Sequence, residues 1–220
     1  MYPLPPIHKP LLCYVTDRRS LADGPEQART RQLEKIEEAA KAGVDWIQIR
    51  EKDLSGRALT EFVQEALRRA AGRCAILIND RLDVACAVKA NGVHLGEQSL
   101  PVEEAKRLVV EHSGRKDFLI GVSAHSLEGT LRAEDAGANY VIFGPVYVTP
   151  SKASFGQPQG LPRLREVCER VKIPVLAIGG VTLENARECL AAGARGIAAI
   201  RLFQEAADLR ATTRELHGEP

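Results

Sequence analysis

The sequence predicts a single (β/α)8 TIM barrel with parallel strands. Short runs rich in β-branched residues alternate eight times along the 220-residue chain with longer stretches whose apolar residues recur at helical spacing. An Ala-Gly or Ala-Asn pair recurs between a helical stretch and the strand that follows it, where a left-handed cap is usual. Regular alternation of this kind favours a parallel sheet, and eight units favour a closed barrel over a doubly wound open sheet, the alternative fold.

The predicted strands are short apolar runs that follow one another at regular intervals. They cover residues 11–16, 46–50, 75–78, 93–95, 119–122, 140–143, 175–178 and 197–200. Helices are expected to fill most of the segments between them. We therefore expect the barrel over residues 11–216, preceded by a Pro-rich leader at residues 1–10 and followed by a short tail at residues 217–220.

Capping residues at the predicted boundaries support this division. Ser55, Ser126 and Thr182 each precede a helical pattern and can accept a hydrogen bond from its first turn. Pro101 suits the first position of a helix. We expect the Gly or Asn of each recurring pair to adopt the left-handed conformation. These pairs are Ala42-Gly43, Ala90-Asn91, Ala136-Gly137 and Ala192-Gly193.

Composition narrows the classes of partner. The 30 Lys and Arg residues balance 29 Asp and Glu residues, so the formal charge of +1 favours neither nucleic acid nor an anionic membrane. The five cysteines are scattered without a CxxC pair, which argues against a disulfide framework and a structural zinc site. No segment approaches the roughly 18 apolar residues of a membrane span. We expect a cytoplasmic protein with small-molecule partners, either monomeric or a homo-oligomer.

The most informative polar residues lie in the second predicted strand and just beyond it. Because side chains alternate across a strand, Gln48, Arg50 and, if the strand continues, Lys52 share one face. The apolar residues between them would face the helices, so the polar set is expected to point into the barrel. Buried cations without acidic partners are unfavourable, and an anionic ligand would serve as their counterion. The alternative is an internal ion pair with Glu51 or Asp53.

Asn79 and Asp80 follow the third predicted strand directly. In a TIM barrel the loops after the strand C-termini build the active site. A carboxylate beside cationic residues suits Mg2+ that bridges a pyrophosphate, since Mg2+ often binds one or two carboxylates together with substrate phosphate oxygens. The alternative is that Asp80 only caps the next helix. Arg18 and Arg19, in the first loop, either reach the substrate or stay solvated, and we leave them outside the candidate site.

The last two strands predict a phosphate site. Gly179 and Gly180 lie between the seventh strand and a helix, and Arg201 follows the eighth strand. Loops at these positions commonly bind phosphate in this fold through backbone N–H groups. The long loop at residues 144–160 is rich in Gly, Pro, Ser and Lys, which is typical of a mobile lid, although an ordinary flexible crossover has the same composition.

Two histidines lie at or near strand ends. His125 follows the fifth predicted strand, where an imidazole can exchange protons with a substrate near neutral pH. His94 lies within the fourth strand and is interpreted as a hydrogen-bonded core or rim residue. The chain has no His cluster suited to a metal and no GxSxG motif, which argues against zinc hydrolysis and serine acyl transfer.

Seven motifs in order along the chain resemble one known family. They read YVTD, QIREK, INDRxDxAxxxxAxGVHLG, GVSAHSLE, GPVYVTPSK, AIGGVT and GIAAI. Together they resemble the thiamine phosphate synthase and thiazole tautomerase family over nearly the whole chain. The resemblance implies a TIM-barrel transferase of thiamine biosynthesis, which joins hydroxymethylpyrimidine pyrophosphate to thiazole phosphate and releases pyrophosphate with the help of Mg2+.

The resemblance also implies a role for each matching position. The pyrimidine and its pyrophosphate would contact Gln48, Arg50, Lys52, Asn79 and Ser123. Lys152 would close over the pyrophosphate. The thiazole phosphate would contact Thr149, Ser151, Gly180, Ile200 and Arg201. Asp80 matches a family Mg2+ ligand.

Two positions depart from the family pattern. Ser99 stands where synthases usually carry a second Mg2+-binding aspartate, and Glu97 is a candidate substitute two residues away. Arg201 replaces a small residue, although an Arg there suits a bidentate phosphate contact. Both departures keep two alternatives open. One is a metal-independent thiazole tautomerase with His125 as its acid and base, and the other is a non-catalytic regulator that binds thiazole or thiamine phosphate.

Overall fold

Eight parallel strands close into a barrel in the computed structural model, which describes residues 9–149 and 157–219. Each strand pairs with its neighbour in sequence, and β8 pairs with β1, so the sheet has no free edge. The strands are β1 (Leu11–Val15), β2 (Trp46–Ile49), β3 (Ala75–Asn79), β4 (Gly92–Leu95), β5 (Leu119–Ala124), β6 (Tyr140–Phe143), β7 (Val175–Ile178) and β8 (Gly196–Ala199). The predicted TIM barrel is confirmed, and the open-sheet alternative is wrong.

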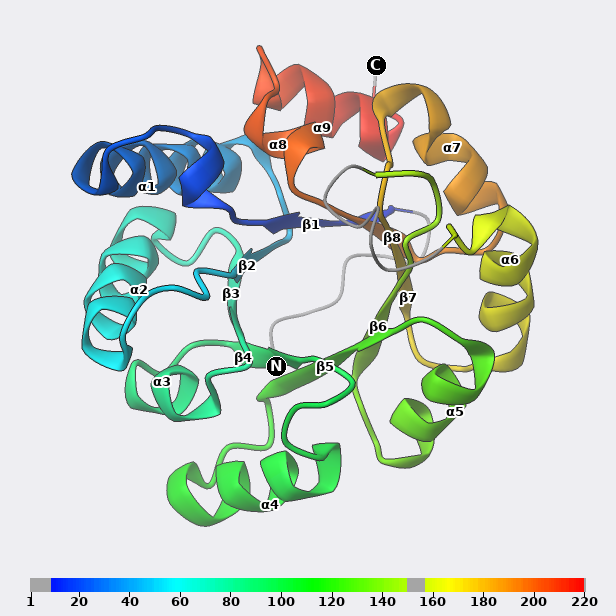
Figure 1. The fold of residues 1–220 in the computed structure, drawn as a ribbon, viewed down its shortest axis with the longest axis horizontal. Coiled ribbons are helices and arrows are strands. Elements are labelled where there is room, and N and C mark those ends of the chain that lie inside the picture. The colour runs from blue at the N-terminus through cyan, green and yellow to red at the C-terminus, as the bar shows by residue number, and fades with distance from the viewer. Residues whose placement is uncertain (1–8, 150–156, 220) are drawn as a thin grey trace.

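The helices surround the barrel as an outer ring (Figure 1). They are α1 (Pro25–Ala42), α2 (Gly56–Ala70), α3 (Leu82–Ala87), α4 (Val102–Ser113), α5 (Leu127–Asp135), α6 (Gly160–Arg170), α7 (Leu183–Ala191), α8 (Arg201–Gln204) and α9 (Leu209–His217). A short 3-10 turn, η1 (Arg18–Ser20), follows β1. After β8 the chain continues through α8 into α9, which packs between α1 and α7. Phe203 of α8 and Leu209 of α9 are both buried.

Alternation along the strands produces two separate apolar regions. Residues such as Leu12 and Ile47 face outward and pack against the helices, whereas Leu11 and Trp46 belong to a second cluster inside the barrel. Within that interior cluster the rings of Trp46 and Tyr140 lie 4.6 Å apart between centroids, at 56°. The interior is thus filled by side chains at its centre and leaves only its open ends for a ligand.

The predicted helix starts are confirmed at three positions. The Ser55 hydroxyl accepts from the Ala58 amide at 3.3 Å, and Ser126 accepts from Gly129 at 3.0 Å. Thr182 forms a capping box with Asn185 at the start of α7. Pro101 is the residue before α4 rather than its first helical residue, a shift of one position.

Three of the four predicted left-handed turns have the expected glycine. Gly43, Gly137 and Gly193 have φ values of +92°, +83° and +102°. The fourth turn differs, because Lys89 rather than Asn91 has the positive φ, +57°. Asn91 acts through its side chain instead.

Asn91 belongs to a contact that recurs at the start of alternate strands. Its backbone N–H donates to the Ile76 carbonyl at 2.9 Å, and its side-chain oxygen accepts from the Ile76 N–H at 2.9 Å. Asp45 makes the same two bonds to Leu12, and Asn139 makes them to Ile120. A residue just before β2, β4 or β6 therefore ties that strand to the previous one at the bottom of the barrel.

The state of the cysteines and the character of the helices can be compared with what the composition predicts. All five thiols are free, and Cys13, Cys74 and Cys189 are buried. Burial raises the pKa of Cys74 to about 12 and that of Cys168 to about 11, so these groups remain protonated at neutral pH. No helix in the described ranges has the length and apolar character needed to cross a membrane.

Candidate active site

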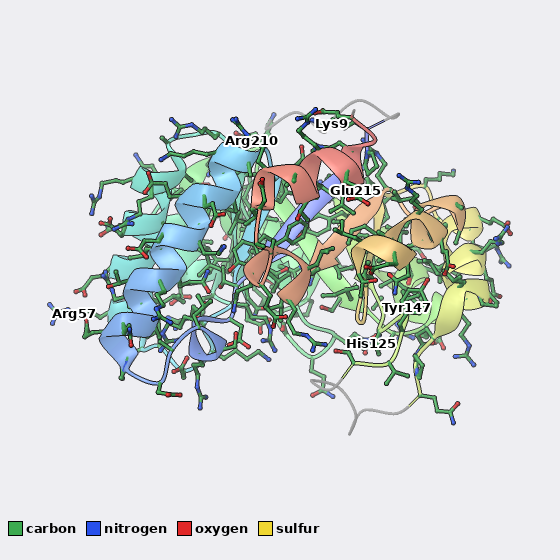
Figure 2. All side chains as sticks on the ribbon, turned by 90° about the horizontal axis from the view of Figure 1, so that it is seen from above. Lys9, Arg57, His125, Tyr147, Arg210 and Glu215 are labelled. Atoms are coloured by element: carbon green, nitrogen blue, oxygen red, sulfur yellow. The ribbon has the colours of Figure 1, made fainter. Side chains whose placement is uncertain are left out.

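The predicted site residues gather at the end of the barrel where the strands finish. Asn79 is the last residue of β3, Ser123 lies near the end of β5, and Ile200 comes directly after β8. Figure 2 shows His125 and Tyr147 at this end, whereas Lys9 lies at the opposite end of the molecule. Two further predicted residues, Ser151 and Lys152, fall outside the part of the chain that the structure describes.

The second strand presents its polar residues as alternation predicts. Gln48 lies in the strand with 3% of its surface exposed, and Arg50 and Lys52 follow the strand end, half-buried and exposed respectively. Among the described residues neither cationic side chain makes a hydrogen bond or an ion pair. The expected alternative, pairing with Glu51 or Asp53, is wrong because a different arginine binds both carboxylates.

That arginine is Arg18, which was expected either to reach the substrate or to stay solvated. Its guanidinium lies 2.9 Å from the Glu51 carboxylate and 2.7 Å from Asp53. Glu51 also accepts from the Thr16 hydroxyl at 2.6 Å, and Thr16 in turn accepts from the Arg50 backbone N–H at 3.0 Å. Arg18 therefore neither contacts the mouth directly nor stays solvated, but is 7% exposed and braces the end of β2 from outside.

Burial and pairing oppose each other in this cluster. Burial raises the pKa of Glu51, and hydrogen bonds from Thr16 and Arg18 only partly offset that effect. The pKa of Asp53 is lowered, chiefly by its hydrogen bond from Arg18. The cluster keeps its carboxylates away from Arg50 and Lys52, so the two cations at the mouth stay available to an anion.

Asn79 and Asp80 form a hydrogen-bonded chain with Gln48. The Gln48 side-chain NH2 donates to the Asn79 carbonyl oxygen at 3.0 Å, and the Asn79 NH2 donates to the Asp80 carboxylate at 2.8 Å. This order leaves Gln48 Oε1 as a buried acceptor without a partner in the described structure. A ligand group that donates a hydrogen bond would satisfy it.

Asp80 does not cap α3, contrary to the alternative considered from the sequence. Its Oδ1 instead accepts from the Gly96 N–H at 3.1 Å and from the Ser99 hydroxyl at 2.5 Å. Burial acts to raise its pKa, but hydrogen bonds from Ser99 and Gly96 and the charge of Lys52 outweigh burial and lower it. Asp80 is therefore ionised at neutral pH.

The two residues that match the family's metal positions are neighbours in space. Ser99 contacts Asp80, whereas Glu97, the suggested substitute, accepts from the His125 backbone N–H at 3.3 Å. Within residues 9–149 and 157–219 no group of three or more His, Cys, Asp and Glu side chains is arranged to hold a metal ion. The only carboxylate that bonds directly to both Ser99 and Asn79 in this region is Asp80.

Ser123 contacts His94, which in turn contacts Tyr140. The His94 Nε2 atom lies 2.9 Å from Ser123 Oγ, and its Nδ1 atom lies 3.2 Å from the Tyr140 hydroxyl. His94 is 2% exposed, and burial lowers its pKa to about 4, so the ring is neutral at physiological pH. This confirms the expected core histidine. Three strands, β4, β5 and β6, supply the contact, which no sequence spacing shows.

His125 lies just after β5 and is half-buried. Its Nδ1 hydrogen-bonds the carbonyl oxygen of Gly144, in the loop after β6, and must therefore carry a proton. That bond fixes the ring in one orientation and leaves Nε2 as its basic nitrogen.

Close backbone approach shapes the predicted phosphate side. Gly180 has a φ of +67°, and a Cβ at this position would lie 2.6 Å from the Val148 carbonyl oxygen. Only glycine lets the turn after β7 lie this close to the loop that carries Thr149. Ile200 packs against the interior cluster, and Arg201 begins the four-residue α8 with its side chain exposed.

Comparisons with known proteins agree on one family. A family model described as thiamine monophosphate synthase matches residues 12–203. A relative from Shouchella clausii, named thiamine-phosphate synthase, is 41% identical over 185 residues, which cover 84% of this chain and 86% of the relative. The chain belongs to the thiamine monophosphate synthase family. A second relative of the same name, from Clostridium novyi, is 36% identical over 204 residues, or 92% of this chain and 95% of that protein.

Comparison with solved structures finds the same fold, and one of the similar structures bears a thiamine phosphate name. Thiamine phosphate pyrophosphorylase from Pyrococcus furiosus superposes with a TM-score of 0.80 at 36% identity, covering 97% of this chain and 96% of that one. A 3-hexulose-6-phosphate synthase, at 17% identity and a TM-score of 0.66, shares only the fold. Family membership confirms the resemblance seen in the motifs, and a thiamine-phosphate synthase, a transferase of thiamine biosynthesis, is the function that the relatives support.

Proposed function

We propose that this protein joins hydroxymethylpyrimidine pyrophosphate to thiazole phosphate and releases pyrophosphate, with Mg2+ as its cofactor. The observation that carries the proposal is the pair of cations at the mouth, Arg50 and Lys52, which have no partner in the described structure while Arg18 binds the nearby carboxylates. An anionic leaving group supplies the missing counterion. The names of the relatives agree with this reaction.

Mg2+ fits the residues beside these cations. Asp80 is an ionised carboxylate, and Ser99 places a hydroxyl oxygen against it at 2.5 Å. Mg2+ commonly binds one or two carboxylates, waters and substrate phosphate oxygens, so Asp80 with Ser99 beside it is a sufficient protein share of the site. When bound, the ion would neutralise charge on the departing pyrophosphate.

The chain's own residues divide the remaining tasks. Arg50 and Lys52 would stabilise the negative charge of the leaving pyrophosphate, with Lys152 closing over it. Gln48 Oε1, a buried acceptor without a partner in the described structure, suits the amino group of the pyrimidine, and Ser123 would contact the same ring. Loss of pyrophosphate leaves a cation on the pyrimidine methylene, which the aminopyrimidine ring delocalises, so no protein nucleophile is needed.

The thiazole phosphate would bind on the opposite side of the mouth. We propose its contacts at Thr149, Ser151, Gly180, Ile200 and Arg201. Arg201, at the start of α8, offers a bidentate contact to the phosphate. The thiazole nitrogen then attacks the methylene cation, and the barrel contributes by holding the two rings in line and excluding water. The cytoplasmic location and the oligomeric state stay predictions.

The first experiment measures pyrophosphate release by the purified protein supplied with both substrates. With Mg2+ we expect pyrophosphate and thiamine phosphate in equal amounts, and with EDTA we expect neither. The Shouchella clausii relative, assayed in parallel, is the control. No thiamine phosphate where the control forms it would contradict the proposal. Proton exchange on a carboxylated thiazole phosphate would then indicate a tautomerase using His125, and binding without turnover would indicate a regulator.

A further inference from the structure

Three side chains inside the barrel form a hydrogen-bonded chain from the packed centre to the mouth. The Tyr140 hydroxyl lies 3.2 Å from His94 Nδ1, and His94 Nε2 lies 2.9 Å from Ser123 Oγ. Tyr140 and His94 are 0% and 2% exposed, whereas Ser123 is half-buried near the end of β5. The chain therefore ends at a residue that a ligand can reach.

The Tyr140 hydroxyl decides which atom donates in each bond of this hydrogen-bonded chain. Within the described residues its only hydrogen-bond partner is His94 Nδ1, and the Trp46 ring packs against the tyrosine ring. A buried hydroxyl hydrogen without an acceptor is strongly unfavourable, so Tyr140 donates to Nδ1. A neutral imidazole has one N–H group, which must then be on Nε2 and donate to Ser123.

The absence of a side chain at Gly121 makes this arrangement possible. A Cβ at Gly121 would lie 2.0 Å from Cζ of Tyr140 and 2.4 Å from its hydroxyl oxygen. The tyrosine ring thus occupies the place where a β5 side chain would lie, and it reaches across that strand to His94 on β4. Glycine at this position is required because the Tyr140 side chain fills the place of a Cβ, and not because of the backbone angles of Gly121.

We propose that His94 and Tyr140 are positioning residues that make Ser123 a hydrogen-bond donor to the bound pyrimidine. Because Ser123 Oγ accepts from His94, its own hydrogen points to the ligand, and the ligand atom there must be an acceptor. A ring nitrogen of an aminopyrimidine meets this requirement, whereas a C–H or N–H group at the same place does not. This inference rests on the proposed function for the identity of the ligand.

The direction of the chain is measured without substrate, by 15N NMR of the histidine rings in the full-length protein. We expect His94 to carry its proton on Nε2, and its signals are assigned by their loss in His94→Gln. In Tyr140→Phe the Nδ1 partner is removed, so the signals should move toward the other tautomer. Tyr14→Phe also removes a buried hydroxyl, one that bonds Gln204 and Gln32, and should leave the His94 signals unchanged. A proton on Nδ1 in the wild type would overturn the proposal.

The consequence for the ligand is measured with two substrate analogues, each with one ring nitrogen of the pyrimidine replaced by C–H. For one analogue we expect wild-type kcat/KM to fall about 10-fold, the loss of one hydrogen bond, and Ser123→Ala to show no such difference. His94→Leu should reduce the ratio of kcat/KM between the natural pyrimidine and this analogue, because the Ser123 hydroxyl is then free to turn its hydrogen away from the ligand. His94→Gln, whose amide NH2 can replace Nε2–H, should restore the wild-type ratio.

Two outcomes separate this inference from the reaction itself. If wild type, Ser123→Ala and His94→Leu all had the same kcat/KM ratio between substrate and analogue, the proposed role of the hydrogen-bonded chain would be overturned even in an active enzyme. No thiamine phosphate from the wild type would overturn the proposed function, and the pyrimidine as ligand with it, while the tautomer seen by NMR still decides the direction of the chain.

Discussion

At the scale of single residues, the end of β2 shows how the site is kept open for an anion. Alternation along β2 places Glu51 on the opposite face from Gln48, Arg50 and Lys52, and its bonds to Thr16 and Arg18 on the outer side agree with this. The sequence could not predict which cation binds Glu51. Arg18 is 33 residues away along the chain, and only the pairing of β1 with β2 brings the two together.

Removing that cation tests the role of the pair. In Arg18→Met the buried Glu51 carboxylate loses its partner, and we expect the free energy of unfolding in urea to fall by about 3–5 kcal/mol. Arg57→Met is the control, because Arg57 is exposed and its pairing with Glu61 contributes about 0–1 kcal/mol. Equal losses in the two variants would contradict the assignment.

The same variant has a predicted pH dependence. Burial raises the pKa of Glu51 in the folded state, so the native protein binds this proton more tightly than the unfolded chain, and stability falls as pH rises through that pKa. Without Arg18 the pKa rises further. The loss of stability in Arg18→Met should therefore be largest near about pH 8 and shrink toward about pH 5, as protonation neutralises the carboxyl. A loss independent of pH would count against an unpaired Glu51.

Asp80 carries a separate prediction for the reaction. Asp80→Asn keeps the size of the side chain but removes its charge, and we expect kcat to fall about 100-fold or more and the Mg2+ concentration for half activity to rise. Asp83→Asn, three residues along the chain and paired with Arg81, should leave both values within about 2-fold. If His125→Ala were the only damaging change, a metal role for Asp80 would be wrong.

At the scale of elements, the turn between β7 and α7 is constrained by its close contact with the loop after β6. The sequence indicated a phosphate-binding turn from the glycine pair before a helix, and the capping box of Thr182 confirms where that helix begins. It could not show that Gly180 lies against the Val148 carbonyl, because that loop follows a different strand.

Gly180→Ala should therefore be damaging for two reasons. The left-handed φ alone costs about 1–2 kcal/mol, and Gly218→Ala measures that part, since Gly218 has a φ of +70° with nothing within 4 Å of its Cβ position. Gly180→Ala adds the clash, so we expect a larger loss of stability and a fall of about 10-fold or more in kcat/KM for thiazole phosphate. Thermal unfolding and initial rates check both parts, and equal effects of the two variants would contradict the close approach.

At the scale of the whole molecule, the order and type of the strands were predictable because each strand is apolar and each helix amphipathic. Strand ends shifted by one or two residues, as at Arg50 and Ser123, because the last hydrogen bonds depend on the neighbouring strand. Contacts across strands were not predictable in the same way. Tyr140, His94 and Ser123 meet through the register of β4, β5 and β6, which only the closed barrel defines.

The contacts of Asp45, Asn91 and Asn139 predict which circular permutants of the barrel remain stable. Lys9 Nζ and Glu219 Oε1 lie 3.6 Å apart, so a linker of several residues can join these two positions. A circular permutant opened between residues 72 and 73 keeps all three contacts and should fold within about 2 kcal/mol of the parent. One opened between residues 89 and 90 places a free end beside Asn91 and should be less stable by at least about 1 kcal/mol more. Urea unfolding compares the two.

The same contacts divide the barrel into quarters that are not equivalent. In the first three quarters an Asp or Asn side chain fastens the second strand to the first. In the last quarter Arg195 holds that position, and its guanidinium donates to the Lys9 carbonyl at 2.6 Å instead. In the fourth quarter this side chain therefore binds the segment just before β1 and links β8 to β1. Hydrogen exchange after Arg195→Ala should quicken first along that seam, while the amides of Leu12, Ile76 and Ile120 stay protected.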